Sequence, residues 1–175
     1  MENKRLSSEP LPSDMELLGE GKAFQDTICG MLMDAKGFEE FEPEDLTYLA
    51  RHMKAYRVGE GTTIFREGDQ NSYLCVLIEG RVCVYKEDHD NENKLLSTIP
   101  PGRIFGEISV LDNFPYSASV IAESDAVFLL MSREGFRQCI DNKPVLGVRL
   151  LSLIACLLCA RLRSASGQLI AFIDV

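Results

Sequence analysis

The stretch FGEISVLDNFPYSASV, residues 105–120, is the part of this chain that decides the fold. Gly106 lacks a Cβ, so a bound group could approach the backbone closely there. Residues 108–111 are expected to form one helical turn whose free N–H groups make an anion site. Glu107 beside that site can accept hydrogen bonds from hydroxyls. Backbone donors for a phosphate next to a carboxylate for a sugar diol indicate a nucleotide.

This stretch resembles the phosphate-binding cassette of the cyclic-nucleotide-binding domain family. The family includes bacterial catabolite activator proteins, the regulatory subunits of cyclic-AMP-dependent kinase and the cyclic-nucleotide-gated channels. Its pattern is Phe-Gly-Glu, a short apolar helix, a spacer, and Arg-[Ser/Thr]-Ala-[Ser/Thr]-Val. FGEIS at 105–109 matches the first half, SASV at 117–120 matches the end, and Tyr116 stands at the position of the family arginine.

The resemblance implies a set of ligand-binding residues. They are Gly106, Glu107, Ile108, Ser109, Tyr116, Ser117 and Ala118. Backbone N–H groups and the serine hydroxyl would hold a cyclic phosphate, and the glutamate would hold the ribose.

Tyr116 changes what this site is expected to bind. The family arginine makes a charge-assisted, often bidentate contact with the phosphate, whereas tyrosine is uncharged near neutral pH and donates one hydrogen bond. Loss of the cation should cost on the order of 2–5 kcal/mol. Cyclic AMP or cyclic GMP is therefore expected as a weak ligand at most, unless another cation such as Arg103 takes the role. No other cofactor and no metal is expected.

Outside the cassette the sequence predicts a mainly β protein. From residue 56 the apolar period is two, in short runs separated by glycine turns, which is typical of a small barrel or sandwich. FREGD at 65–69 and LIEGRV at 77–82 resemble recurrent turns of the same family, so the resemblance covers about residues 41–140. It implies a double-stranded β-helix (jelly-roll) barrel with N-terminal helices and a long C-terminal dimerisation helix.

We expect four segments along the chain. They are a disordered arm at 1–14, a helical extension at 15–40 with one or two short helices between residues 15 and 33, the cyclic-nucleotide-binding-like barrel at 41–140, and the dimer helix and tail at 141–175. Pro43 predicts the start of an entry helix. The apolar face expected for that helix comprises Leu46, Leu49, Ala50 and Met53. Ser132 should cap a short helix, and Pro144 should start the last one, which is expected to end near Arg163.

The last helix carries two apolar stripes. The first has coiled-coil spacing and comprises Leu146, Leu150, Leu153, Leu157 and Ala160; the second comprises Leu151, Ile154, Leu158 and Leu162. One stripe can cover the barrel while the other meets a second copy, so a homodimer is expected. A membrane span is the rival interpretation. It is disfavoured because the uninterrupted apolar run covers only residues 150–160 and a span needs about 20 residues.

Composition narrows the functional classes. The net charge of −9 disfavours a nucleic-acid surface. The six cysteines are irregularly spaced and no signal peptide is visible, which indicates reduced thiols in the cytoplasm. Cys156 and Cys159 are expected to be buried rather than to hold zinc. The acidic tip at 87–93 is expected to be a solvated loop rather than a metal loop.

Three interpretations remain open. The first is a cyclic-nucleotide-binding-type regulatory or sensor domain in signal transduction, with weakened or altered ligand binding. The second is a ligand-free interaction and dimerisation module that kept the fold. In the third, FGEIS and SASV simply build the barrel.

No catalytic constellation indicates an enzyme. Only twelve residues follow Arg163, too few for a winged helix-turn-helix, so DNA binding by this chain alone is not expected.

Overall fold

The computed structural model describes residues 14–173, and nearly all of the expected arm at 1–14 lies outside them. The described residues fall into two compact units divided between Arg137 and Gln138. The first unit carries the cassette and the second carries the last helix.

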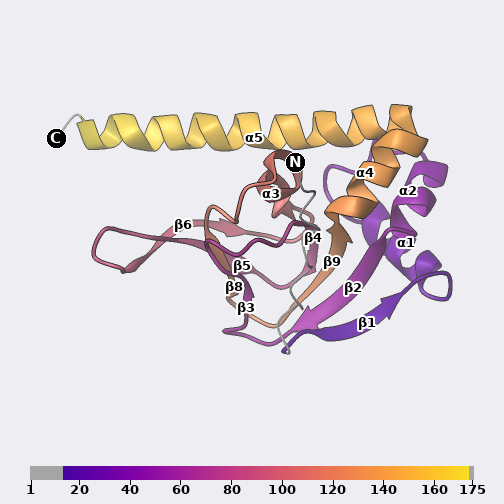
Figure 1. Ribbon diagram of the computed structural model, residues 1–175, viewed down its shortest axis with the longest axis horizontal. Helices are drawn as coiled ribbons and strands as arrows, with labels where there is room; N and C mark the ends of the chain where they lie inside the picture. Colours follow the sequence, from indigo (N-terminus) through magenta and orange to yellow (C-terminus); the bar gives the residue numbers. More distant parts are fainter. Residues whose placement is uncertain (1–13, 174–175) are drawn as a thin grey trace, which may run out of the picture. The chain divides into compact units, whose positions relative to one another are not determined.

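Two antiparallel sheets build the first unit (Figure 1). One sheet has the order β1 (Glu16–Glu20), β2 (Met53–Val58), β9 (Ala126–Ser132), β4 (Tyr73–Glu79) and β7 (Ile104–Phe105). The other has the order β3 (Thr63–Phe65), β8 (Ser119–Ala122), β5 (Val82–Glu87) and β6 (Asn93–Ile99). Neighbours in each list pair antiparallel, and the crossovers between distant strands give the expected jelly roll, which is confirmed.

The core between the sheets is rich in aromatic side chains. Phe105 and Phe128 meet edge to face with ring centroids 5.9 Å apart, and Phe65 lies 5.7 Å from Phe105. Such offset and tilted pairs are the favoured geometries for aromatic rings. β9 is buried from its first residue to Met131, because it lies in the middle of its sheet. These rings form the part of the hydrophobic core that lies beneath the cassette.

The N-terminal extension is only partly helical. α1 (Gln25–Met33) confirms a helix, but residues 16–20 form β1, so the prediction of helix there is wrong. β1 pairs antiparallel with β2, and the register sets Glu16 opposite Arg57 and Glu20 opposite Lys54. Both pairs are salt bridges. Cross-strand charge pairing and the free edge of β2 favour a strand over an isolated helical turn.

The entry helix is shorter than expected. α2 (Pro43–Ala50) begins with its proline, and its buried residues are Leu46, Leu49 and Ala50. Met53 is buried as predicted but belongs to β2, so its assignment to the helix face is wrong. The chain leaves the helix through a turn in which the His52 N–H donates to the Leu49 carbonyl at 2.9 Å.

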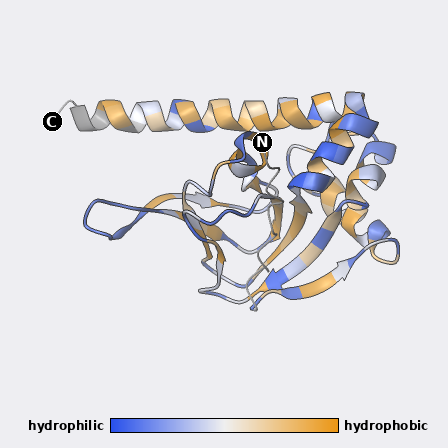
Figure 2. Cartoon of the chain, viewed as in Figure 1, coloured by the Kyte–Doolittle hydropathy of each residue, from blue (hydrophilic) through white to orange (hydrophobic). Residues whose placement is uncertain are grey.

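The last two helices follow β9. α4 (Arg133–Asn142) starts as predicted, with the Gly135 N–H donating to Ser132 Oγ at 3.1 Å. α5 (Pro144–Ile173) has 30 residues and continues well past the expected end near Arg163. Figure 2 shows apolar residues along much of its length. The buried residues of α5 include Leu146, Leu150 and Ile154, which come from both predicted stripes, so the predicted division into two stripes is wrong.

The structure differs from two further expectations about α5, which concern the burial of its cysteines and the exclusion of a membrane span. Cys156 and Cys159 are exposed rather than buried, because they lie on a different side of the helix from Leu150 and Ile154. The 24-residue segment Pro144–Gly167 is long and apolar enough to cross a membrane by length and composition alone. The short uninterrupted run therefore no longer excludes a span by itself.

Candidate functional site

The cassette begins where β7 ends. Gly106 adopts the left-handed conformation, with φ of 76°, and leads into α3 (Glu107–Asp112). A Cβ on Gly106 would lie 2.3 Å from the Tyr73 carbonyl oxygen and 2.9 Å from the Phe65 ring. The absence of a side chain here is thus required by the protein's own packing and by the backbone conformation. A ligand is not needed to explain this glycine.

α3 buries polar as well as apolar side chains and exposes Ile108. Glu107 and Ser109 are buried, with 0% and 1% of their surface exposed, whereas Ile108 is exposed. Ser109 Oγ donates to the Gly106 carbonyl at 3.1 Å, and the Asn113 N–H donates to the Ser109 carbonyl at 3.1 Å. Internal hydrogen bonds therefore hold both ends of the helix.

Tyr116 is part of the hydrophobic core. Only 6% of its surface is exposed. Its ring stacks on Phe65, with centroids 4.3 Å apart and planes inclined by 18°. An arginine side chain would have to place a guanidinium among these rings, whereas a tyrosine ring fills the same space with apolar surface.

Hydrogen bonds fix Tyr116 at three points. Its backbone N–H donates to the Asp69 carbonyl at 3.0 Å, and its carbonyl accepts from the Gly68 N–H at 2.9 Å. At the other end of the side chain, the hydroxyl oxygen accepts from the Tyr73 N–H at 3.1 Å. We call this arrangement of Tyr116, Phe65 and the Tyr73 amide the tyrosine lock.

Burial also keeps the Tyr116 hydroxyl of the tyrosine lock uncharged. Desolvation raises the pKa of the Tyr116 hydroxyl far above its ordinary value, and the neighbouring Cys75 adds to the rise. The Tyr73 backbone amide and the Ser109 side chain oppose this through hydrogen bonds, but burial wins. The hydroxyl is therefore neutral at physiological pH and offers no positive charge to a phosphate.

The structure brings only part of the predicted set into one interior cluster. Glu107, Ser109 and Tyr116 lie buried together in the cassette, while Ala118 is half-buried and Ser117 is exposed. Ile108 points its side chain to the surface, although its backbone belongs to the same turn as Glu107. Whether these residues contact a ligand stays a prediction.

Arg103 lies beside another charge. Backbone hydrogen bonds from Glu39 itself and Gly37 lower the pKa of the Glu39 carboxyl, and the positive charges of Lys36 and Arg103 lower it further. The Arg103 carbonyl accepts from Leu77 at 2.9 Å, which fixes its backbone on the β4 side. The structure therefore gives no sign that Arg103 replaces the family arginine.

A cation that the sequence analysis missed does touch the cassette. Lys86 Nζ, on β5, donates to the Ser117 carbonyl at 2.8 Å and forms a salt bridge with Glu67. The Glu67 N–H in turn donates to Ser119 Oγ at 3.0 Å. The pairing of Tyr85 with Ser119 in the β5–β8 register brings Lys86 there, and only that register could have revealed it. Glu67 neutralises its charge, so Lys86 holds the end of the cassette in place.

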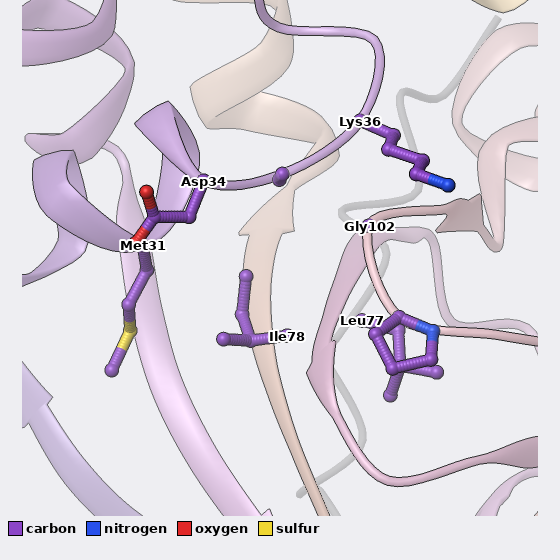
Figure 3. A pocket seen from close by; sticks show the side chains of 8 residues that line it. Met31, Asp34, Lys36, Leu77, Ile78 and Gly102 are labelled. Carbon is purple, nitrogen blue, oxygen red and sulfur yellow. The ribbon is translucent and has the colours of Figure 1, made fainter.

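A separate pocket lies away from the cassette (Figure 3). Its volume is about 210 Å³. The residues that line it are Met31, Asp34, Ala35, Lys36, Leu77, Ile78, Pro101 and Gly102. Its floor is apolar and its rim carries one charge of each sign, and none of the predicted ligand-binding residues takes part.

The acidic hairpin tip satisfies its carboxylates locally. Asp88 Oδ1 accepts from the N–H groups of Asp90 and Glu92, both at 2.9 Å, and Lys94 approaches its other oxygen at 3.4 Å. The backbone hydrogen bonds from Glu92 and Asp90 lower the pKa of Asp88. Within residues 14–173 no group of three or more potential ligands is arranged to hold a metal ion.

The described residues thus form a jelly roll in which a glycine-led helical turn is followed by a returning strand. The model of the cyclic nucleotide-binding domain family matches residues 56–143, and the chain belongs to this family. The chain is 28% identical over 140 residues to a CRP-like cAMP-activated global transcriptional regulator of Mycobacterium tuberculosis, covering 79% of this chain and 61% of that protein. It is 30% identical over 132 residues to a cyclic AMP receptor protein of Thermus thermophilus, covering 75% and 59%.

Solved structures agree with the fold. A cyclic nucleotide-binding domain from Methylobacillus flagellatus KT superposes with a TM-score of 0.78 at 29% identity, covering 90% of this chain and 89% of that one. The chain spans about three fifths of the length of the curated relatives it matches. The family and the fold are therefore shown, while the activities of those longer proteins are not carried over.

Proposed function

We propose that this chain is a regulatory domain of the cyclic nucleotide-binding family that works without a cyclic nucleotide, binding cyclic AMP and cyclic GMP weakly or not at all. The observation that carries this proposal is the tyrosine lock. Tyr116 stands where the family pattern has arginine, and it is built into the core by its ring, its backbone and its hydroxyl.

Two costs to phosphate binding add up at Tyr116. The missing cation costs on the order of 2–5 kcal/mol, or roughly 30- to 5,000-fold in affinity. Turning the hydroxyl toward a phosphate would also take it from the Tyr73 N–H, and a buried amide left unpaired costs about 1–3 kcal/mol. A phosphate-containing ligand must overcome both costs. This supports a cassette that excludes the phosphate rather than one that only binds it more weakly.

A second candidate function is a sensor with an altered ligand. Among the described residues, Glu107 and Ser109 are the buried polar or charged side chains, and both belong to the cassette. A carboxylate at 0% exposure in an apolar core is costly and is often kept for a polar ligand. This candidate requires a ligand without a phosphate at the position of Tyr116.

We also propose that α5 joins two copies of the chain. Val148, Ala155, Leu162 and Leu169 recur at seven-residue intervals, and all four are exposed in the single chain. Leu151, Leu158 and Ala165 form a second set at the same interval, three residues after the first. Two such sets are the a and d positions of a coiled coil. The seam is distinct from the buried residues Leu146, Leu150 and Ile154.

The proposal also covers nucleic-acid binding, catalysis and location in the cell. The net charge of −9 argues against a nucleic-acid surface, so the proposal does not include the transcriptional role that the name of the Mycobacterium tuberculosis relative carries. No catalytic activity is proposed, and the protein is proposed to act in the cytoplasm through protein contacts.

Calorimetry with cyclic AMP and cyclic GMP tests the main proposal. We expect no heat of binding at ligand concentrations up to about 100 μM. Glu107→Ala is the matched variant, and it should behave like the native chain. Submicromolar affinity for either nucleotide, lost in Glu107→Ala, would establish a sensor and overturn the proposal.

A further inference from the structure

We infer that the outer face of the cassette is a docking surface for an acidic, amphipathic segment of a partner protein. The surface comprises Ile108, Leu111, Phe114, Arg133 and Arg137, and we call it the cassette face. This inference deepens the proposed function and rests on it, because a locked cassette presents this face without any ligand.

The apolar part of the cassette face is unusually open. Ile108, Leu111 and Phe114 are exposed to 39%, 38% and 70% of their surface. Ile108 and Leu111 are three residues apart in α3 and share one side of it, opposite the buried Ser109. Large exposed apolar side chains gathered in one place and rimmed by charge mark interaction sites.

The turn after α3 holds Phe114 outward. Asn113 adopts a left-handed conformation with φ of 64°, and Asp112 Oδ1 accepts from the Phe114 N–H at 2.9 Å. This hydrogen bond fixes the backbone on which the ring stands. A rigid aromatic side chain on a fixed turn is typical of the residue that anchors a protein interface.

Two arginines stand beside this apolar patch. Arg133 and Arg137 are one turn apart on α4. The Arg133 N–H donates to the Ser72 carbonyl at 3.1 Å, and Ser72 Oγ donates to the Ser109 carbonyl at 3.2 Å, so a single residue links the start of α4 to α3. Asp112, at the end of α3, acts on Arg133 electrostatically.

Neither arginine forms an ion pair with a carboxylate in the part of the chain that the structure describes, although the charge of Asp112 acts on Arg133. Within residues 14–173, Arg133 Nε is also buried with no hydrogen-bond partner. Burial and the positive charge of Arg137, one turn away, lower the pKa of Arg133, and the charge of Asp112 opposes this. A carboxylate from outside would offset the two neighbouring positive charges.

The positive charges of Arg133 and Arg137 indicate which kind of partner binds the cassette face. A second copy would bring α5 as its most apolar surface, but residues 144–173 contain arginines and no Asp or Glu. That helix cannot supply the missing carboxylate. A segment with two or three apolar side chains on one helical face and acidic residues beside them fits both halves of the cassette face.

A peptide-display selection on the full chain tests this inference. Random 16-residue peptides are selected, and the enriched ones are measured by fluorescence anisotropy. We expect net-acidic peptides with apolar residues at helical spacing. Phe114→Ser should weaken their binding at least tenfold, Arg133→Glu with Arg137→Glu should do the same, and binding should fall as salt rises from 50 to 500 mM.

A matched surface elsewhere provides the control. Leu95 and Leu96 on β6 are exposed to 55% and 52% next to Lys94. The triple variant Leu95→Ser, Leu96→Ser and Lys94→Glu should leave the binding of the selected peptides unchanged. Enrichment of basic peptides, or equal sensitivity to the β6 variant, would overturn the docking surface. So would a lower sedimentation mass in Phe114→Ser, since the face would then join two copies.

Repeating the anisotropy with 1 mM cyclic AMP separates this inference from the proposed function. Unchanged peptide binding, together with no heat of cyclic AMP binding in the calorimetry, supports both. If cyclic AMP binds and changes the affinity for the peptide, the docking surface stands while the ligand-free function fails. If no acidic peptide binds and cyclic AMP has no effect, the docking surface alone fails.

Discussion

The cassette and helix α5 depart in opposite directions from the usual distribution of polar and apolar groups. The cassette buries Glu107 and Ser109 and closes over them with Tyr116. α5 exposes large apolar residues such as Leu162 and Leu169, at 69% and 62%. The buried polar pair is enclosed within one chain, whereas an exposed apolar seam requires something outside it. We therefore expect the contacts of this protein to be made by its surfaces rather than by its interior.

The largest effect is expected for removal of the Tyr116 ring. Tyr116→Ala deletes a buried aromatic side chain stacked at 4.3 Å on Phe65, and it should lower the free energy of unfolding by about 3–5 kcal/mol. Tyr116→Phe keeps the ring and loses the hydroxyl, so it should cost about 1–3 kcal/mol. Urea denaturation measures both. A loss below about 1 kcal/mol for the alanine variant would mean that the ring is not part of the core.

The second effect concerns repair of the phosphate site. Tyr116→Arg supplies the missing cation, and if the cassette backbone is otherwise competent it should gain on the order of 2–5 kcal/mol in binding cyclic AMP. Calorimetry and a ligand-dependent rise in melting temperature measure the gain. Adding Glu107→Ala should remove much of it. A folded Tyr116→Arg variant that binds nothing at millimolar ligand would show that the pocket is reshaped beyond one side chain, as an interaction module would require.

The exposed seam offers the third test. Leu162→Glu with Leu169→Glu places carboxylates at two a positions, which should cost on the order of 2–4 kcal/mol of association free energy and turn the dimer into a monomer. Light scattering at micromolar concentration reads the mass directly. Ser164→Glu lies off the seam and serves as the control. A native chain that is monomeric, or that floats with lipid vesicles, would contradict the coiled-coil seam and favour a membrane for α5.

The smallest effect is expected at the Lys86–Glu67 salt bridge. The hydrogen bond from Lys86 lowers the pKa of Glu67 below its ordinary value of 4.5. The folded pKa is then below the unfolded one, so the stabilisation is present above about pH 4.5 and is lost as pH falls through the folded value. Both side chains are partly exposed, so the contribution should be about 1 kcal/mol or less. Lys86→Met should flatten the acid limb of a stability profile against pH, and an unchanged limb would show that the pair contributes nothing.

Strand periodicity and glycine turns were sufficient to predict a small barrel or sandwich, because they are local signals that tertiary packing reinforces, and the resemblance of the cassette supplied the jelly roll. It was insufficient where a tertiary partner decides the outcome. Residues 16–20 carry no strong period and became a strand because β2 offered a free edge. Met53 continued the helical spacing of α2, yet it paired with Met131 in a sheet.

The candidate site shows the same limit. The sequence identified Tyr116 as the departure that matters, since that conclusion needs only a comparison of side-chain chemistry. It could not show that the Tyr73 amide and the Phe65 ring come from distant strands to hold the tyrosine. Lys86 was missed for the same reason, because its contact with Ser117 depends on the pairing of β5 with β8.

The packing around Gly106 affects how the Phe-Gly-Glu motif is interpreted in related chains. Its neighbours would stand 2.3 and 2.9 Å from any Cβ, so the packing of this chain requires the glycine whether or not a nucleotide is ever bound. The glycine by itself therefore carries no information about occupancy. The informative position is the one four residues after the short helix ends, here Tyr116. Under the proposed function, related chains with an uncharged side chain at this position are expected to bind cyclic nucleotides weakly or not at all.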